Sequence, residues 1–250
     1  MSTVASIFKR EVKSYFSSPV AYIVLVVFLV LSGLFFFIYV HGFVESQYDP
    51  RLQSYGRKLN LNDFVITPYF GTINILLLLM IPLITMRLLA EEKKNFTSEL
   101  LFTSPIGSLQ IVVGKYLASF FLFIVMLALS YINVGVLQFV GNPDPFVILT
   151  GYIGLVLLGG SFLAVGLFAS SLTENQIVAA IVSFGLLLIF WIMGATSDPE
   201  GSVLGYMSII NHFEGFTKGV VDIKDVVYYL SFIFIGLFLT NIVIDSERWR

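Results

Sequence analysis

The sequence predicts an all-α, polytopic membrane protein with six transmembrane helices, an N-terminal interfacial amphipathic helix and both termini in the cytoplasm. Of its 250 residues, 57% are hydrophobic and only 12% are charged, whereas soluble domains average about 25% charged residues. The chain contains six long runs without a charged residue, and most of its basic residues fall at alternate connections between them. These observations predict one transmembrane domain that spans residues 1–250.

Composition excludes several classes of site. The chain has no cysteine, which rules out disulfides, thiolate catalysis and cysteine-ligated metals, and its two histidines are too few for an imidazole cluster. The net charge of −2 provides no electrostatic footprint for nucleic acid. We therefore expect no metal site and no nucleic-acid partner, and the lipid bilayer is the first expected partner.

The six uncharged runs each approach or exceed the length needed to cross a hydrocarbon core of about 30 Å. They are Val20–Val40, Pro68–Met86, Tyr116–Leu137, Phe146–Leu172, Ile177–Ala195 and Val226–Ile244. The fourth run is over-long, so it is expected to tilt, bend at its glycines or project beyond the bilayer. Ser18 and Thr67, each followed by proline, are predicted to cap the first two spans, and the segment 173–176 reads as a capping box for the fifth.

The distribution of basic residues predicts the orientation. With a cytoplasmic N-terminus, nine basic residues lie on the inner side and five on the outer side, while the acidic residues divide seven to nine. Because positive charge favours the cytoplasmic side, both termini are expected in the cytoplasm.

Residues 1–19 contain an amphipathic segment before the first span. Phe8 lies on its apolar arc, and Lys9, Arg10 and Lys13 lie on the opposite face. Such a helix is expected in the inner-leaflet interface, with its basic face toward anionic headgroups. Glu11 falls within the apolar arc and weakens the pattern. The alternative is an ordinary basic cluster that only sets the topology.

None of the six runs contains Asp, Glu, Lys, Arg or His. Ion-coupled transporters and voltage sensors need such groups at membrane depth, so both classes are disfavoured. The polar residues of the runs are expected to form hydrogen bonds between helices rather than a substrate site; they are Asn74, Ser130, Asn133, Ser183 and Asn241. The small-residue patterns Gly160-x-x-x-Ala164 and Gly166-x-x-x-Ser170 are typical of close helix packing.

The sequence also lacks the usual catalytic motifs. No H-E-x-x-H metalloprotease motif is present, and Gly159–Leu163 fails the last position of a G-x-S-x-G motif. Between Gly107 and Gly114-Lys115 the glycine spacing is too long for a phosphate loop, and Tyr116 replaces its Ser or Thr. We therefore expect no catalytic residue and no cofactor bound by this chain, and infer that it is not an enzyme and hydrolyses no ATP.

The connection between the second and third runs, residues 87–110, is the most distinctive segment. A dense charge run is followed by three successive large apolar residues, Leu100, Leu101 and Phe102, and then by Ser104-Pro105. A solvated charged face explains the first part. It does not explain apolar side chains on a water-facing loop, which suggest insertion into a partner's groove or into the interface.

This loop resembles the signature of type-2 ABC transporter permeases, E-E-[KR]-x-x-G-T-x-E-L-L-x-x-[ST]-P-[VI] followed by G-K. The matching residues are Glu91, Glu92, Lys93, Thr97, Glu99, Leu100, Leu101, Ser104, Pro105, Ile106, Gly114 and Lys115. Phe96 departs from the usual glycine. Segments 8–11 and 17–19 resemble the family's elbow helix, and 171–176 resembles its junction between spans four and five. Segments 212–216 and 218–222 look closest to the gliding-motility-associated branch.

The resemblance implies a half-transporter that pairs with a second permease half, as a homodimer or heterodimer. Each half docks a separate cytoplasmic ABC ATPase, which would hold ATP and Mg. The loop would form the coupling helix, with Glu91, Glu92 and Glu99 offering contacts to basic residues of the ATPase and Leu100 and Leu101 an apolar anchor. Lys93, Lys94, Thr97, Phe102, Ser104 and Pro105 complete the expected coupling residues. The alternative for the glutamates is pairing with Arg87, Lys93 and Lys94 within the loop.

Residues 196–225 form a second informative connection, on the expected outer side. Val203–Phe216 is apolar but too short to span, so an interfacial or re-entrant segment is expected, and the resemblance places short extracytoplasmic helices there. His212 is a candidate pH sensor, although a structural role is the more frequent one for a single histidine.

Taken together, the sequence is interpreted as the permease subunit of an ABC exporter in a bacterial inner membrane. It is expected to be driven by ATP hydrolysis on the separate ATPase. An alternative is a non-transporting scaffold or mechanotransmitter in which the same loop acts on an auxiliary periplasmic protein. A passive channel is a third interpretation, but it leaves the coupling loop without a purpose.

Overall fold

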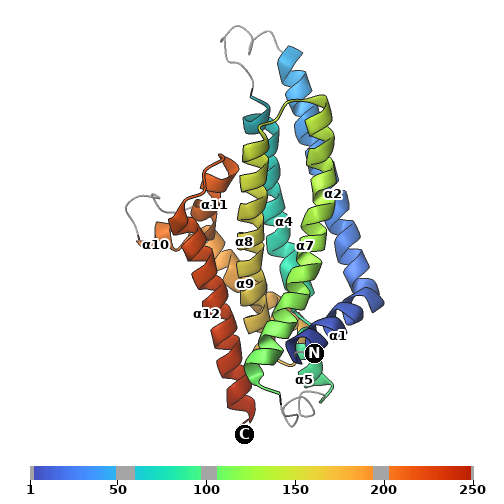
Figure 1. The fold of residues 1–250 in the computed structure, drawn as a ribbon, viewed down its shortest axis with the longest axis vertical. Coiled ribbons are helices and arrows are strands. Elements are labelled where there is room, and N and C mark those ends of the chain that lie inside the picture. Colours follow the sequence, from blue (N-terminus) through green and yellow to red (C-terminus); the bar gives the residue numbers. More distant parts are fainter. Residues whose placement is uncertain (1–2, 49–59, 97–105, 194–202, 249–250) are drawn as a thin grey trace.

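The computed structural model describes residues 3–48, 60–96, 106–193 and 203–248, and this part of the chain contains helices and no strand. Long helices lie side by side in an elongated bundle (Figure 1). The helices are α1 (Thr3–Ser17), α2 (Pro19–Tyr48), the π-helical turn η1 (Asn62–Ile66), α4 (Thr67–Thr85), α5 (Ala90–Lys94), α7 (Ser108–Val140), α8 (Pro145–Ser171), α9 (Gln176–Ile192), α10 (Val203–Tyr206), α11 (Ile209–Thr217) and α12 (Ile223–Arg248).

Helix α8 forms the centre of the bundle, where it packs against α4, α7, α9, α11 and α12. Small residues allow this packing: a Cβ on Gly166 would lie 2.2 Å from the Thr85 hydroxyl, so only glycine admits α4 at this point. Helices α2 and α12 lie at the periphery and expose many large apolar side chains, Phe37 and Phe234 among them. Exposed apolar faces on long helices match a lipid surround.

Five helices of the described chain are long and apolar enough to cross a membrane, which confirms a multi-pass, all-helical architecture. They include the predicted runs one, two, three, four and six. The fifth predicted run, Ile177–Ala195, coincides with α9, an apolar helix of 17 residues that ends at Ile192. The count of six spans therefore stays a prediction, because α9 is shorter than the other five and residues 194–202 lie outside the described chain.

Two predicted helix caps are wrong. Helix α4 continues directly from η1, so Thr67 is already helical and its hydroxyl donates instead to the Thr217 carbonyl at 3.3 Å. At α9, the N-cap is Asn175 rather than Thr173: its side chain accepts hydrogen bonds from the backbone N–H groups of Ile177 and Val178. Asparagine caps as well as threonine does, and here it lies directly before the helix.

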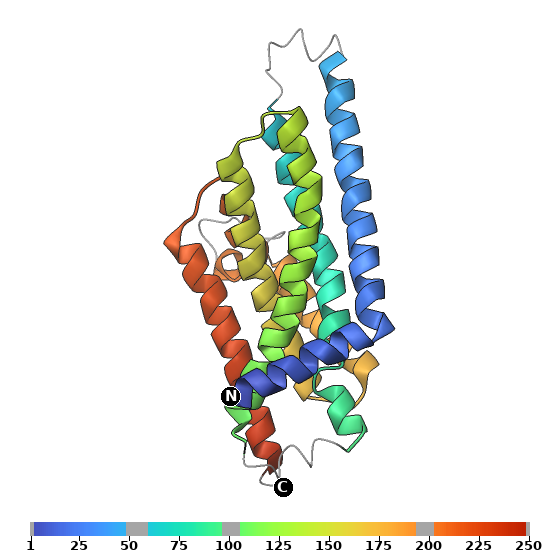
Figure 2. The ribbon, with the colours of Figure 1, turned by 45° about the vertical axis from the view of Figure 1, so that its right-hand side comes forward.

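The two ends of the bundle differ. We call the end that holds α1, α5 and the last turn of α12 the basal end, and the opposite end the distal end. Helix α1 lies across the basal end, roughly crosswise to α2 and α7 (Figure 2). The first turn of α1 and the last turn of α12 both lie at the basal end (Figure 1). The start of α1 and the end of α12 thus lie on the same side of the bundle, and the cytoplasmic location of both termini remains a prediction.

Helices α10 and α11 follow α9 in the described chain, and α11 lies beside α8 and α12. His212 on α11 is buried, with Nδ1 2.6 Å from an Asp225 carboxylate oxygen and Nε2 2.8 Å from the Tyr206 carbonyl. Its ring also stacks on Tyr228 at 3.9 Å between centroids. These contacts give His212 a structural role, in which it ties α11 to the first turn of α12.

Candidate functional site

The loop after α4 lies at the basal end, and the structure describes its first part, through Phe96. Four of its charged residues, Glu91 to Lys94, lie in the short helix α5, Ala90–Lys94, whose C-cap is Asn95. Phe96 follows with a positive φ of 55° and is 74% exposed. This left-handed conformation is one that glycine adopts freely, which explains the glycine usual at this position of the signature. The remaining expected coupling residues, Thr97, Glu99, Leu100, Leu101, Phe102, Ser104 and Pro105, lie outside the described residues.

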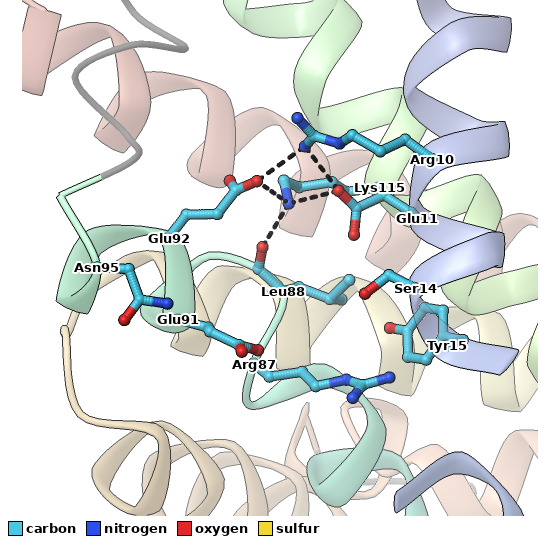
Figure 3. Close-up of a pocket in the computed structure, with 10 residues that line it drawn as sticks. All are labelled: Arg10, Glu11, Ser14, Tyr15, Arg87, Leu88, Glu91, Glu92, Asn95 and Lys115. Atoms are coloured by element: carbon cyan, nitrogen blue, oxygen red, sulfur yellow. Dashed lines mark hydrogen bonds and ion pairs between the residues drawn. The ribbon is translucent and has the colours of Figure 1, made fainter. Parts of the chain in front are cut away.

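A buried lysine anchors this loop to the bundle. Lys115, in the second turn of α7, is only 1% exposed. Its ammonium group lies 2.6 Å from the Leu88 carbonyl, 3.1 Å from Glu11 and 3.0 Å from Glu92 (Figure 3). These three acceptors match the three N–H donors of a lysine. Lys115 therefore joins three elements, α1, α5 and α7, at one point.

Arg10 completes what we call the basal cluster, composed of Arg10, Glu11, Glu92 and Lys115. Its guanidinium lies 2.8 Å from both the Glu11 and the Glu92 carboxylates. Two cations and two carboxylates thus alternate in one compact network, as the dashed lines of Figure 3 show. The network carries no net charge, and each ionised group in it has a partner of opposite charge. This pairing offsets the cost of removing the charges from water.

The electrostatics of Glu11 follow from this environment. Burial alone would raise the pKa of the Glu11 carboxyl, but Lys115 and Arg10 outweigh burial and hold that pKa below its usual value. The position of Glu11 in the apolar arc of α1, which weakened the amphipathic pattern, is thereby explained: the side chain faces Lys115 rather than lipid. From the sequence alone this carboxylate is an irregularity in the amphipathic pattern, and a charge on an apolar face is itself a signal that a partner lies elsewhere in the fold.

Gly114 allows α1 to approach α7 closely enough to form the cluster. A Cβ on Gly114 would lie 2.7 Å from Cγ2 of Ile7, a contact that real side chains do not make. The two residues of the Gly114-Lys115 pair thus have different roles. Gly114 lets α1 pack closely against α7, and Lys115 forms an ion pair with Glu11 of α1. In the sequence this pair matches the signature, but its position predicts only the start of the third span.

Further contacts fix the loop to α8 and α12. The Ser170 hydroxyl accepts hydrogen bonds from the backbone N–H groups of Leu89 and Ala90, both at 3.1 Å, and donates to the Met86 carbonyl. Lys93 on α5 donates to the Ser171 carbonyl of α8 and to the Glu247 carboxylate of α12. Ser170, predicted only to permit close helix packing, therefore shapes the loop itself.

Arg87 connects the loop to the bend between α1 and α2. Its guanidinium donates to the Ser18 hydroxyl at 2.9 Å and lies over the Tyr15 ring, 4.5 Å from its centroid. Tyr15 in turn donates to the Ile84 carbonyl, and burial raises the pKa of its phenol. Arg87 therefore contacts the elbow, and Glu92 forms ion pairs with Arg10 and Lys115. Pairing of the glutamates within the loop stays a prediction, because Glu99 lies outside the described residues.

A cavity of about 320 Å³ opens between α1 and the loop. The cluster residues, Ser14, Glu91 and Asn95 line it, and Figure 3 shows their side chains around it. Its walls come from the two elements that the sequence assigned to different surfaces, the interfacial helix and the coupling loop. The structure makes them one continuous unit.

A profile of the ABC-2 family transporter proteins matches residues 5–240. This match includes most of α1, the loop, the whole of α2, α4, α7, α8 and α9, and the larger part of α12. The chain belongs to the ABC-2 transporter family. A comparison with curated proteins gave no match. As an ABC-2 family protein, the chain is a multi-pass membrane permease subunit, and the family implies an ATPase partner.

The structure of this ABC-2 family protein distinguishes among the residues expected to contact partners. Glu92 and Lys93 are engaged within the chain, whereas Lys94 is exposed on α5 and Glu91 borders the cavity. On α1, Lys9 and Lys13 are exposed, and Phe8 packs against α7 with its ring 5.9 Å from that of Phe121. Arg10, expected at headgroups with them, instead forms ion pairs in the basal cluster.

Proposed function

We propose that this permease is half of an ATP-driven exporter in a bacterial inner membrane, powered by a separate cytoplasmic ATPase that docks on the loop after α4. The ATPase holds ATP and Mg, and a second permease half, identical or related, completes the transporter. In this arrangement the basal end faces the cytoplasm.

The observation that supports the proposal is the way the loop is held. Within ten residues, the loop is bonded to the elbow through Arg87 and Glu92, to α7 through Lys115, and to α8 and α12 through Lys93. A force applied to the loop by a partner would reach all of these helices, because packed helices move as discrete bodies rather than deforming continuously. A loop without a mechanical role would need no such set of contacts.

The elbow helix contributes to this mechanism. Since Glu11 and Glu92 share the same two cations, α1 and α5 move together with the first turns of α7. We propose that α1 lies in the inner-leaflet interface and transmits the motion of the loop along the membrane plane. Lys9 and Lys13 then face the anionic headgroups.

The first experiment is a gentle purification of the tagged chain from its native membrane, with mass spectrometry of what accompanies it. We expect an ABC ATPase. The double change of Leu100→Asp and Leu101→Asp is expected to abolish both ATPase recovery and the permease-dependent ATPase activity, while the helical content is kept. Leu172, which is 52% exposed between α8 and α9, provides the matched control, and Leu172→Asp is expected to keep both. Full ATPase recovery with the double variant would refute docking on this loop.

A second experiment separates export from mechanotransmission, in which the same loop would drive a periplasmic protein. In proteoliposomes, an exporter's ATP hydrolysis is stimulated by its cargo, whereas that of a mechanotransmitter is stimulated by its protein partner. The resemblance of residues 212–216 and 218–222 to the gliding-motility-associated branch keeps the second function as a candidate. Conduction of solute without nucleotide would instead indicate a channel.

A further inference from the structure

A buried pair of titratable side chains lies away from the basal end, where α10, α11 and α12 meet. The pair is His212 and Asp225, each of which is 5% exposed. The imidazole Nδ1 lies 2.6 Å from an Asp225 carboxylate oxygen, and Nε2 lies 2.8 Å from the carbonyl oxygen of Tyr206. Both nitrogens of the ring therefore face an oxygen at hydrogen-bond distance.

These two contacts need one proton more than a neutral imidazole and a carboxylate provide. A neutral imidazole has one N–H group and one lone pair. In either tautomer, the nitrogen without a hydrogen faces the lone pairs of an oxygen at 2.6 or 2.8 Å, which is repulsive. The extra proton lies on the ring as an imidazolium or on Asp225 as a carboxylic acid. Either arrangement completes both hydrogen bonds.

The surroundings of the ring favour the arrangement with the extra proton. The ring of Tyr228 stacks on the imidazole, with 3.9 Å between the centroids and 20° between the planes. The face of an aromatic ring attracts a cation. Loss of the extra proton would also leave the buried Asp225 carboxylate beside a neutral ring, and a buried charge without a charged partner is costly.

The other charged groups near the pair are paired with one another. Two ion pairs line the cavity beside His212, and their side chains are at least 45% exposed; they are Glu214 with Lys218 and Asp222 with Lys224. Helices α8, α9 and α10 also pack against α11 and contain no Asp, Glu, Lys, Arg or His. The tyrosines that face the ring are Tyr206 and Tyr228. Histidine is the side chain whose charge ordinarily changes between pH 5 and pH 8.

The pair holds one part of this region and not the other. We call residues 203–212, which comprise α10 and the start of α11, the switch segment. The hydroxyls of Tyr228 and Tyr229 also donate to backbone carbonyls of the switch segment and its junction with α11. The second half of α11 is held on α8 instead, where the Thr150 hydroxyl donates to the Phe216 carbonyl at 2.9 Å. Loss of the extra proton would therefore loosen the switch segment and leave the second half of α11 in place.

A cavity gives water access to the pair. It has a volume of about 700 Å³, and both His212 and Asp225 line it together with the exposed ion pairs. Water in such a cavity exchanges protons with the pair even though the two side chains are almost fully buried. The protonation of the pair can thus follow the pH of the solution at this side of the bundle.

We infer that His212 and Asp225 form a proton-dependent switch, which holds α10 and the start of α11 on α12 while the pair keeps its extra proton and releases them when it is lost. The switch segment is closed at low pH and loosens as the pH rises. The inference goes beyond the proposed function and does not depend on which side of the membrane this region faces. Its test needs only the purified permease.

Hydrogen exchange of the full-length protein in nanodiscs is the first test. Exchange in residues 203–212 is measured by mass spectrometry between pH 5 and pH 9 and divided by the intrinsic exchange rate at each pH. We expect the normalised exchange to become about ten- to a hundredfold faster as the pH rises, which corresponds to about 1.4–2.8 kcal/mol. This is the size expected for a hydrogen bond with a charged group. Residues 213–217, held on α8, should change less than threefold.

A pair of matched variants tests the role of the carboxylate. Asp225→Asn keeps the shape of the side chain, and its amide donates to an unprotonated Nδ1 or accepts from a protonated one. The contact with His212 is then satisfied at every pH, so the pH dependence of the switch segment should disappear. Asp222→Asn is the control, because Asp222 lines the same cavity but pairs with Lys224, and it should keep the pH dependence. His212→Gln, which has no titratable side chain, gives the same test if Asp225→Asn does not fold.

A second measurement follows the proton directly and leaves the pair unchanged. The chain has two histidines, so in a His41→Gln background the signals of ¹⁵N-labelled histidine come from His212 alone. His41 lies on α2 with a side chain that is 58% exposed. We expect the ¹⁵N chemical shifts of the two ring nitrogens to change over the pH range in which the switch segment loosens.

Four results would overturn the inference. The first is normalised exchange in residues 203–212 that does not change with pH, and the second is exchange that becomes faster as the pH falls. The third is full pH dependence in Asp225→Asn, or in His212→Gln where that variant replaces it. The fourth is a set of His212 ring signals that stays constant between pH 5 and pH 9.

Discussion

Replacing Lys115 with methionine should loosen the basal end without unfolding the bundle. The change keeps most of the side-chain volume and removes the ammonium group. Glu11 and Glu92 would then share only Arg10, and the Leu88 carbonyl would lose its donor. Removing one member of a buried ion pair leaves the other without compensation, which costs about 3–5 kcal/mol.

The expected magnitude here is smaller, because Arg10 remains and its side chain is 52% exposed to solvent that screens the charges. We expect a loss of about 2–4 kcal/mol in the free energy of opening the junction between α1 and α5. At about 1.4 kcal/mol for each factor of ten, this corresponds to amide exchange roughly 30- to 1,000-fold faster in these two helices. Exchange in α11, at the distal end, should not change.

Hydrogen exchange with mass spectrometry on the protein in nanodiscs measures both regions at once. The triple variant Lys115→Met, Glu11→Gln and Glu92→Gln tests whether charge is the cause, because it removes the orphaned carboxylates. It should restore protection to within about tenfold of the parent chain. Lys94→Met, on the exposed face of α5, is the control and should have no effect. Two results would refute the reasoning. One is amide exchange in α1 and α5 that is less than threefold faster in Lys115→Met than in the parent chain, and the other is exchange in the triple variant that is as fast as in Lys115→Met.

Two further predictions concern the same junction, monitored by spin labels at Ser14→Cys and Asn95→Cys in a chain that has no cysteine of its own. The pKa of Glu11 is lower in the folded protein than its usual 4.5. The stabilisation of the junction by the Glu11 carboxylate is therefore complete above pH 4.5 and is lost as the pH falls through the folded-state pKa. The distribution of distances between the two labels should broaden as the pH falls through that value, and Glu11→Gln should reduce this pH dependence. Gly114→Ala should lengthen the distance and destabilise the junction by about 1–3 kcal/mol, and adding Ile7→Ala should reverse this. A Gly114→Ala distance equal to that of the parent would contradict the packing argument.

The long helices could be predicted from the sequence because uncharged length is a local property. Runs such as Val20–Val40 and Phe146–Leu172 need only be long enough and apolar enough, and the structure places helices over both. Helix ends were less predictable, since several residues compete to cap them. Asn175 caps α9, although Thr173 fits the sequence pattern of a capping box. The helical turn η1 precedes Thr67 and continues directly into α4, so Thr67 is not a cap.

The basal cluster could not be predicted in the same way, because its members come from three separate parts of the chain. Glu11, Glu92 and Lys115 are each explicable alone, as an irregular helix residue, a loop charge and a basic flank of a span. Only the crossing of α1 over α7 brings them together, and that crossing depends on Gly114. A charge that contradicts its local pattern was the one clue, since such charges need a partner from elsewhere.

The bond between Lys93 and Glu247 has a practical consequence for engineering. It places the last turn of α12 directly beside α5, so a polypeptide joined after Arg248 starts next to the loop where we propose the ATPase docks. A tether of a few residues would then hold a fused ATPase domain near its docking surface at millimolar effective concentration. Covalent single-chain versions of the assembly should for this reason be built by fusion directly after Arg248, with the linker short and the Glu247 carboxylate kept.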